Sequence, residues 1–304
     1  MSARTIRAVG AVALACAAAA AGCGSDDDNA TSTAATAAAS KTAADPAVVK
    51  LVPPEVKAKG VVTVVLDATY APAEFFAEDG KTIIGMEPDL VTAMAAKMGL
   101  KVKLVNEPFD GIIPGLAAKK YDIGASSFSD TKEREKVVDF VDVFKAAQSF
   151  YTKASGGTEI TGIEDTCGKK VAVQRGSIEQ DGLKAQAAKC RAAGKPAPSV
   201  LSFVDQNSVT LAVNSGRAQL GFADQIISEY TIKKSNGLLK AVGTPIDPLP
   251  SGMAVPKGSG LAEPMLAALK ALMADDSYLK ILGKWGLEDG AISGAAVKIN
   301  GAVS

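Results

Sequence analysis

An arginine in the middle of the chain lies where a side chain could meet a charged ligand. Arg134 falls in the opening turn of an expected helix, with Thr131 as its N-cap. A cation there opposes the helix dipole, so a functional reason for it is worth seeking. Its planar guanidinium can donate two parallel hydrogen bonds to a carboxylate. The alternative is a surface arginine paired with Glu133 or Glu135.

An aspartate could supply the opposite charge. Asp224 follows an expected strand and precedes an expected helix. A carboxylate in that place could hold an ammonium group in a cleft, opposite the guanidinium of Arg134. The alternative is an ordinary helix N-cap, a position that Asp favours.

Four small residues precede expected helices and could offer hydroxyl and backbone groups to a ligand. Ser127 and Ser129 come just before the helix of Arg134. Gly176 and Ser177 come before a later helix, where free backbone N–H groups suit a carboxylate. For each of them, the alternative is a simple turn or cap.

Tyr70, Phe109 and Asp67 all lie at or just after strand ends. The two aromatic rings could line a cleft, exclude water and strengthen polar contacts inside it. Their alternative is core packing. Asp67 ends the first expected strand and offers a further carboxylate.

Strand and helix patterns alternate from residue 61 onward, which predicts an α/β fold with parallel sheets covered by helices. The expected strands cover residues 61–66, 101–105, around 123, 170–173, 199–203 and 219–222. The expected helices start at 87 and cover 110–119, 178–191, 208–215, 225–234 and parts of 261–285. Small ligands bind such sheets at the carboxyl ends of the strands.

The pattern changes near residue 150 and again near 245–250, which divides the chain into two lobes. Residues 48–149 with 250–304 should form lobe I, and 150–249 lobe II, because the last segment is too small to stand alone. Each lobe is expected to be a mainly parallel sheet flanked by helices. Two crossing segments would join the lobes and leave a cleft between them.

The N-terminus has the features of an export signal over residues 1–22. Arg4 and Arg7 precede an apolar, Ala-rich run that is too short to span a bilayer. The run ends in small residues before Cys23, which is similar to the lipobox of bacterial lipoproteins, although Ala20 replaces the usual Leu. Lipidation of Cys23 is therefore expected. The alternative is ordinary secretion with cleavage near Ala21.

Residues 23–47 are small and polar and should form a flexible tether. Anchored in this way, the protein would lie outside the cytoplasm at the cell membrane, in the periplasm or on the outer face. No later segment is apolar and long enough to cross a membrane.

Composition excludes several classes of function. The chain has no His, which removes His-based catalysis and most zinc sites, and no metal or cofactor is expected. Its 33 basic and 33 acidic residues balance, so nothing favours nucleic acid. Cys167 and Cys190 lie in the mature body, and outside the cell they should form a disulfide. The alternative is two buried thiols.

The chain resembles the periplasmic solute-binding proteins of polar amino-acid ABC transporters, the family 3 solute-binding proteins, over about residues 61–287. The stretches that carry the resemblance are DATYAP (67–72), GMEPDL (85–90), FDG (109–111), SSFSDTKER (126–134), CGKKVAVQRGS (167–177), GRAQLGFAD (216–224) and KWG (284–286). The resemblance implies the two-lobed fold of type II periplasmic binding proteins. It also implies a monomer that delivers an amino acid to an ABC permease.

The same resemblance implies roles for individual residues. Arg134 would bind the ligand's α-carboxylate and Asp224 its α-ammonium. An acid at Asp67 can meet a cationic side chain in this family, which gives a lean towards a cationic or amide ligand. The sequence departs from the family at Ile178, where Thr is frequent, and at Ala73, where an aromatic residue is usual.

An enzyme on the same scaffold, such as a dehydratase acting on a small carboxylate, is the main alternative. It would need an acid and a base positioned in the cleft. A sensor domain and a surface lipoprotein without a ligand are further alternatives.

Overall fold

The computed structural model describes residues 42–302, and these belong to one compact unit. The expected export signal, Cys23 and the tether up to residue 41 lie outside the described residues. Within 42–302 the helices are α1 (Pro46–Leu51), α2 (Pro54–Lys59), α3 (Met86–Lys97), α4 (Phe109–Ala117), α5 (Lys132–Glu135), α6 (Ile178–Ala192), α7 (Gln206–Asn214), α8 (Gln225–Lys234), α9 (Ala262–Ala274) and α10 (Ser277–Trp285). Short 3₁₀ helices cover Ile163–Thr166, Glu288–Gly290 and Gly294–Ala296.

The strands form one large and one small sheet. They are β1 (Val61–Leu66), β2 (Thr69–Tyr70), β3 (Glu74–Phe76), β4 (Ile83–Ile84), β5 (Lys101–Asn106), β6 (Ile123–Ser129), β7 (Val138–Lys153), β8 (Lys170–Gln174), β9 (Ser199–Phe203), β10 (Leu220–Asp224) and β11 (Leu239–Pro256). The large sheet has the order β5-β1-β6-β11-β7-β10-β8-β9. Its outer strands pair in parallel, whereas β11 and β7 are antiparallel to their neighbours.

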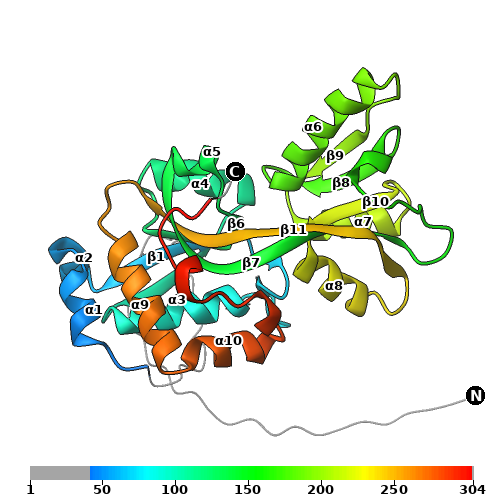
Figure 1. Ribbon diagram of the computed structural model, residues 1–304. Coiled ribbons are helices and arrows are strands. Elements are labelled where there is room, and N and C mark those ends of the chain that lie inside the picture. The colour runs from blue at the N-terminus through cyan, green and yellow to red at the C-terminus, as the bar shows by residue number, and fades with distance from the viewer. Residues whose placement is uncertain (1–41, 303–304) are drawn as a thin grey trace, which may run out of the picture. The chain divides into compact units, whose positions relative to one another are not determined.

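Two long strands run through the middle of this sheet and connect its two ends (Figure 1). β7 has 16 residues and β11 has 18, and they pair with each other from Leu239↔Lys153 to Pro256↔Val138. Most of β7 is buried, including the polar residues Asp142, Gln148 and Ser149, so its burial lacks the alternation that marks a half-buried strand. The sequence analysis expected two crossing segments but did not predict that they are strands.

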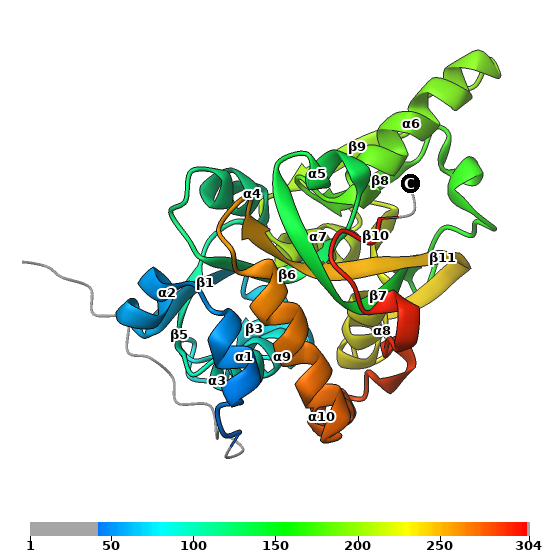
Figure 2. The same ribbon diagram turned by 60° about the vertical axis from the view of Figure 1, so that its left-hand side comes forward.

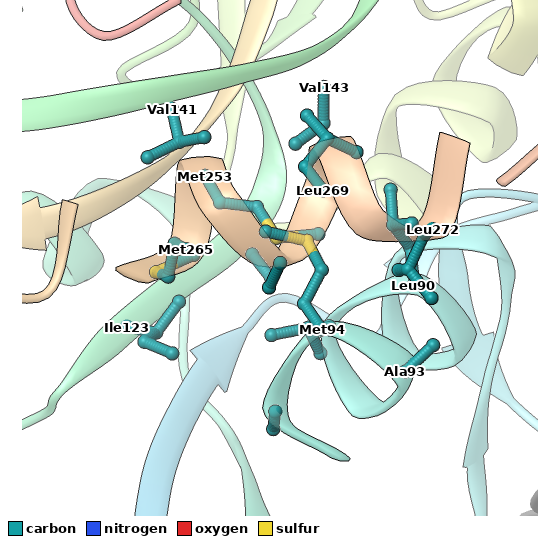
Figure 3. Packing of buried hydrophobic residues seen from close by; sticks show 14 of the residues in the cluster. Leu90, Ala93, Met94, Ile123, Val141, Val143, Met253, Met265, Leu269 and Leu272 are labelled. Carbon is teal, nitrogen blue, oxygen red and sulfur yellow. The ribbon is translucent and has the colours of Figure 1, made fainter. Parts of the chain in front are cut away.

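Each end of the sheet has its own hydrophobic core. The first lobe contains β5, β1 and β6, and its core is formed by α3, α9, α10 and the adjoining parts of β7 and β11. Figure 3 shows Met94 of α3 and Met253 of β11 meeting beside Leu269 of α9. The second lobe contains β10, β8 and β9, with separate clusters around Phe222 and Val209.

The C-terminal helices pack on the first lobe. Helix α9 contacts α1, α3 and α10, and Figure 2 shows it between α1 and α10. The indole N–H of Trp285 in α10 donates to Asp89 in α3 (2.9 Å). The C-terminal helices α9 and α10 therefore belong to the same lobe as the N-terminal helices α1 and α3.

The folded region begins a few residues before the expected boundary at Val48. Asp45 caps α1 by accepting from the backbone N–H of Ala47 (2.8 Å). Val48 and Val52 are buried in the core of the first lobe. The helix therefore starts at Pro46, inside the segment that the sequence analysis assigned to the tether.

The expected disulfide is confirmed. Cys167 and Cys190 are bonded, which ties the segment before β8 to the last turn of α6.

Among the described residues, no helix has the length and apolar character that a membrane crossing requires.

Candidate functional site

A cavity lies between the lobes, at the ends of strands β6, β8 and β10. In this closed arrangement its volume is only about 10 Å³, room for about one water molecule, so a ligand would have to part its walls. Its lining residues are Tyr70, Phe109, Ser127, Ser129, Arg134, Gln174, Ser177, Ile178, Glu179 and Asp224. The structure thus brings together most of the side chains that the sequence analysis singled out. Asp67 and Gly176 lie next to the cavity but do not line it.

Arg134 faces the cavity from α5, a helix of four residues that follows β6. Thr131 is the N-cap of α5 and accepts from the backbone N–H of Arg134 (3.2 Å), as expected. The neighbouring acids, Glu133 and Glu135, pair with lysines instead. The reading of Arg134 as a surface residue paired with one of these acids is therefore wrong.

Two backbone carbonyls orient the guanidinium of Arg134. Nη1 donates to the carbonyl of Ser129 (2.9 Å) in the first lobe, and Nη2 donates to the carbonyl of Gly176 (3.0 Å) in the second. Burial lowers the pKa of Arg134, but a guanidinium remains charged in proteins. Because it has five N–H donors, others remain for a ligand carboxylate.

Two stacked aromatic rings lie beneath the guanidinium. Phe109 and Phe128 stack with ring centroids 4.8 Å apart, and the central guanidinium carbon of Arg134 lies 5.6 Å from each centroid. Such cation–π contacts fix the orientation of a guanidinium in a partly dry site. Phe128 is completely buried, so Phe109 presents the pair to the cavity.

Asp224 ends β10 at the opposite wall and is almost fully buried. It occupies the N-cap position of α8, yet its side chain makes no capping hydrogen bond. Instead its carboxylate accepts from the Tyr70 hydroxyl (3.2 Å), which in turn accepts from the backbone N–H of Asp224 (3.2 Å). Asp224 is therefore not an ordinary capping residue.

Burial controls the electrostatics of Asp224. It raises the pKa of this carboxyl well above its usual range, and the nearby Glu179 raises it further, whereas Tyr70 and Arg134 lower it. A positive charge placed beside Asp224 would favour its ionised form.

Ser127 adopts a strained backbone conformation next to the cavity. Its φ is +46°, in the left-handed region that residues other than Gly rarely adopt. The buried Glu87 holds it there, because one carboxylate oxygen accepts from both the backbone N–H (2.8 Å) and the hydroxyl (3.2 Å) of Ser127. Both hydrogen-bond donors of Ser127 are therefore in use.

Gly176 and Ser177 precede α6. Ser177 is the N-cap of this helix and accepts from the backbone N–H of Gln180 (3.3 Å). Gly176 has a φ of +80°, and an added Cβ would lie 3.0 Å from the Cβ of Asp110. A glycine is therefore required where the two lobes approach each other here.

Asp67 is buried, and both of its carboxylate oxygens accept hydrogen bonds from other residues. One carboxylate oxygen accepts from the hydroxyl of Thr69 (2.8 Å). The other accepts from the backbone N–H of Phe109 (3.1 Å) and from the Gln174 amide (2.7 Å). The last bond joins the lobes, so Asp67 positions the cavity wall formed by Phe109 and Gln174.

The sequence analysis missed two lining residues, Gln174 and Glu179, and noted a third, Ile178, only as a departure from the family. Gln174 ends β8, so the rule that ligands bind at strand ends could have identified it. Glu179 lies in the first turn of α6, where acids are common because they suit the helix dipole. Its position therefore carried no functional signal in the sequence.

Contacts between the lobes surround the cavity. Arg175 donates to both carboxylate oxygens of Asp110 (2.6 and 3.3 Å), and the backbone N–H of Gln206 donates to the Thr69 hydroxyl (3.2 Å). These contacts join residues of the first lobe to residues of the second. Within residues 42–302, no cluster of acidic and Cys side chains is arranged to hold a metal ion.

A polar cavity between two α/β lobes that are linked by a pair of strands defines a two-lobed ligand-binding protein. Residues 62–288 match the bacterial extracellular solute-binding proteins, family 3, and the chain belongs to this family. It is 34% identical over 253 residues to an arginine-binding protein of Corynebacterium glutamicum, with 83% of each chain covered. It is 28% identical to an arginine-binding extracellular protein of Bacillus subtilis, covering 72% of this chain and 83% of the relative.

Solved structures give the same fold. An ancestral arginine-binding protein bound to arginine is 36% identical, with a TM-score of 0.68 over 74% of this chain and 98% of that one. An ancestral amino acid-binding protein, described as a precursor of cyclohexadienyl dehydratase, is 31% identical, with a TM-score of 0.68 over 76% and 97% of the two chains.

Proposed function

We propose that this protein captures a polar L-amino acid between its lobes and delivers it to an ABC permease. The observation that carries the proposal is the pair of opposite charges in one cavity, Arg134 from the first lobe and Asp224 from the second. A guanidinium suits an α-carboxylate and a buried carboxylate suits an α-ammonium. The relatives named for arginine support a ligand of this class.

Ligand exchange requires the lobes to move apart. We infer that lobe I (48–149 and 250–304) and lobe II (150–249) rotate about β7 and β11, the two strands that cross between them. The irregular register of β11 between Val242 and Leu249 supports a hinge there, because bulges relax the ladder. Small-angle X-ray scattering should show a smaller radius of gyration with ligand than without it.

A thermal-shift screen against the common amino acids, followed by calorimetry, tests the binding function. We expect a large rise in melting temperature with at least one amino acid. Analysis of the ligand by mass spectrometry after incubation separates binding from catalysis. Recovery of unchanged ligand supports a binding protein, whereas a new product would support an enzyme such as a dehydratase.

We also propose that the mature protein is lipidated at Cys23 and lies outside the cytoplasm at the cell membrane. The export features of residues 1–22 support this, and so does membership of an extracellular protein family. Cys23→Ser should move the protein from the membrane fraction to the soluble fraction. Equal membrane association of the variant would exclude a lipid anchor at this residue.

A further inference from the structure

The charges that line the cavity do not balance for a simple zwitterion. The lining residues with acidic or basic side chains that can be charged near neutral pH are Arg134, Glu179 and Asp224, which are one guanidinium and two carboxyl groups. In the proposed function, the α-carboxylate of the ligand faces Arg134 and its α-ammonium faces Asp224. Glu179 then lacks a counter-charge.

The side chain of Glu179 is built into the site rather than exposed beside it. The residue is only 3% exposed, although it lies in the first turn of a helix, where acids usually face water. Its Oε1 has no hydrogen-bond partner among the described residues. A buried carboxylate oxygen without a hydrogen-bond partner is costly, so a ligand cation that paired with this oxygen of Glu179 would gain binding free energy.

Other acids near the cavity are less suited to this role. Asp67 does not line the cavity, and both of its carboxylate oxygens already accept hydrogen bonds. Glu74 and Glu87 each have a buried oxygen without a partner, but neither lines the cavity. Among these acids, Glu179 is therefore the one that both lines the cavity and has an oxygen without a hydrogen-bond partner.

We propose that Glu179 binds the side-chain cation of the ligand and so selects amino acids with a net charge of +1. With such a ligand, the cavity holds two positive charges of the ligand against two carboxylates, and one ligand carboxylate against Arg134. This assignment rests on the proposed function. It makes Glu179, rather than Asp67, the residue that distinguishes a cationic ligand from a neutral one.

The test compares arginine with citrulline, which has the same shape but a neutral side chain, by calorimetry on the mature protein. Glu179→Gln removes the charge and preserves the size of the side chain. We expect this variant to bind arginine at least about 30-fold more weakly and citrulline within about threefold of the wild type. Glutamine serves as a second neutral ligand, and retained binding of either shows that the variant is folded.

Asp181→Asn is the matched control. Asp181 lies two residues further along α6, pairs with Lys184 and has a 69% exposed side chain. Its removal changes the charge of the same helix turn by the same amount, so it should leave the ratio of arginine to citrulline affinity unchanged. If both substitutions changed the ratio of arginine to citrulline affinity equally, Glu179 would act only through its long-range charge. That result would overturn the assignment.

Three other results would also overturn the assignment. Equal weakening of arginine and citrulline by Glu179→Gln would mean that Glu179 supports the part common to both ligands. Stronger binding of both would mean that Glu179 competes with the ligand carboxylate for Arg134. A selective loss of arginine binding in Asp67→Asn but not in Glu179→Gln would return the role to Asp67. If the wild type binds no amino acid, the proposed function itself fails, which is a distinct outcome.

Discussion

Replacing Arg134 with Ala should abolish measurable binding of every amino acid ligand. The substitution removes the guanidinium that Ser129 and Gly176 orient by hydrogen bonds of 2.9 and 3.0 Å. It therefore removes the partner of the ligand carboxylate and one contact that holds the lobes together. It leaves Phe109 and Phe128 stacked, so the cavity wall should persist.

The expected loss of binding free energy in Arg134→Ala is that of removing one member of a buried charge pair, about 2–5 kcal/mol. At about 1.4 kcal/mol for each tenfold change, the dissociation constant should rise between about 30-fold and several thousand-fold. Arg134→Lys keeps the charge but cannot bridge two carbonyls and a carboxylate with a planar fork. We expect this variant to bind the ligand about tenfold more weakly than the wild type does.

Isothermal titration calorimetry with the best wild-type ligand and two other amino acids measures these effects. Arg217→Ala is the control, because Arg217 is exposed, contacts the ring of Phe203 and lies outside the cavity. Affinity within threefold of the wild type in Arg134→Ala would refute the carboxylate role. A loss confined to one ligand would show that Arg134 contacts the side chain instead.

Further predictions concern proton release, buried acids and the disulfide. Burial raises the pKa of Asp224, and a ligand cation favours its ionised form, so binding should release a proton. Calorimetry in buffers of different ionisation enthalpy should detect this proton, and the affinity should rise as the pH rises towards neutral. Burial raises the pKa of Glu87 from 4.5 to about 7, so the folded protein holds this proton more tightly than the unfolded chain does. Stability should therefore fall by about 3 kcal/mol as pH rises through this range, and urea unfolding of Glu87→Gln should lack that fall. Replacing Cys167 and Cys190 with Ser should lower the unfolding free energy by about 3 kcal/mol in urea titrations and leave ligand affinity unchanged; a loss of affinity would show that the disulfide also shapes the cavity.

The sequence by itself determined the fold class and much of the site. The β-branched run of β1 and the capped starts of α5 and α6 follow local rules, so their positions were predictable. The family resemblance indicated Arg134 and Asp224, and the cavity contains both. The pairing of Cys167 with Cys190 followed from the expected oxidising environment.

Only the tertiary structure decided which neighbouring acid is free to meet a ligand. Asp67 lies within a segment that the family resemblance marked and Glu179 follows another, and the sequence analysis gave the role towards a cationic ligand to Asp67. Gln174 and Phe109 come from distant parts of the chain and occupy the carboxylate of Asp67, whereas Glu179 keeps an oxygen without a partner. Hydrogen bonds between residues far apart in sequence decide this difference, because local patterns do not encode which groups meet when the lobes pack.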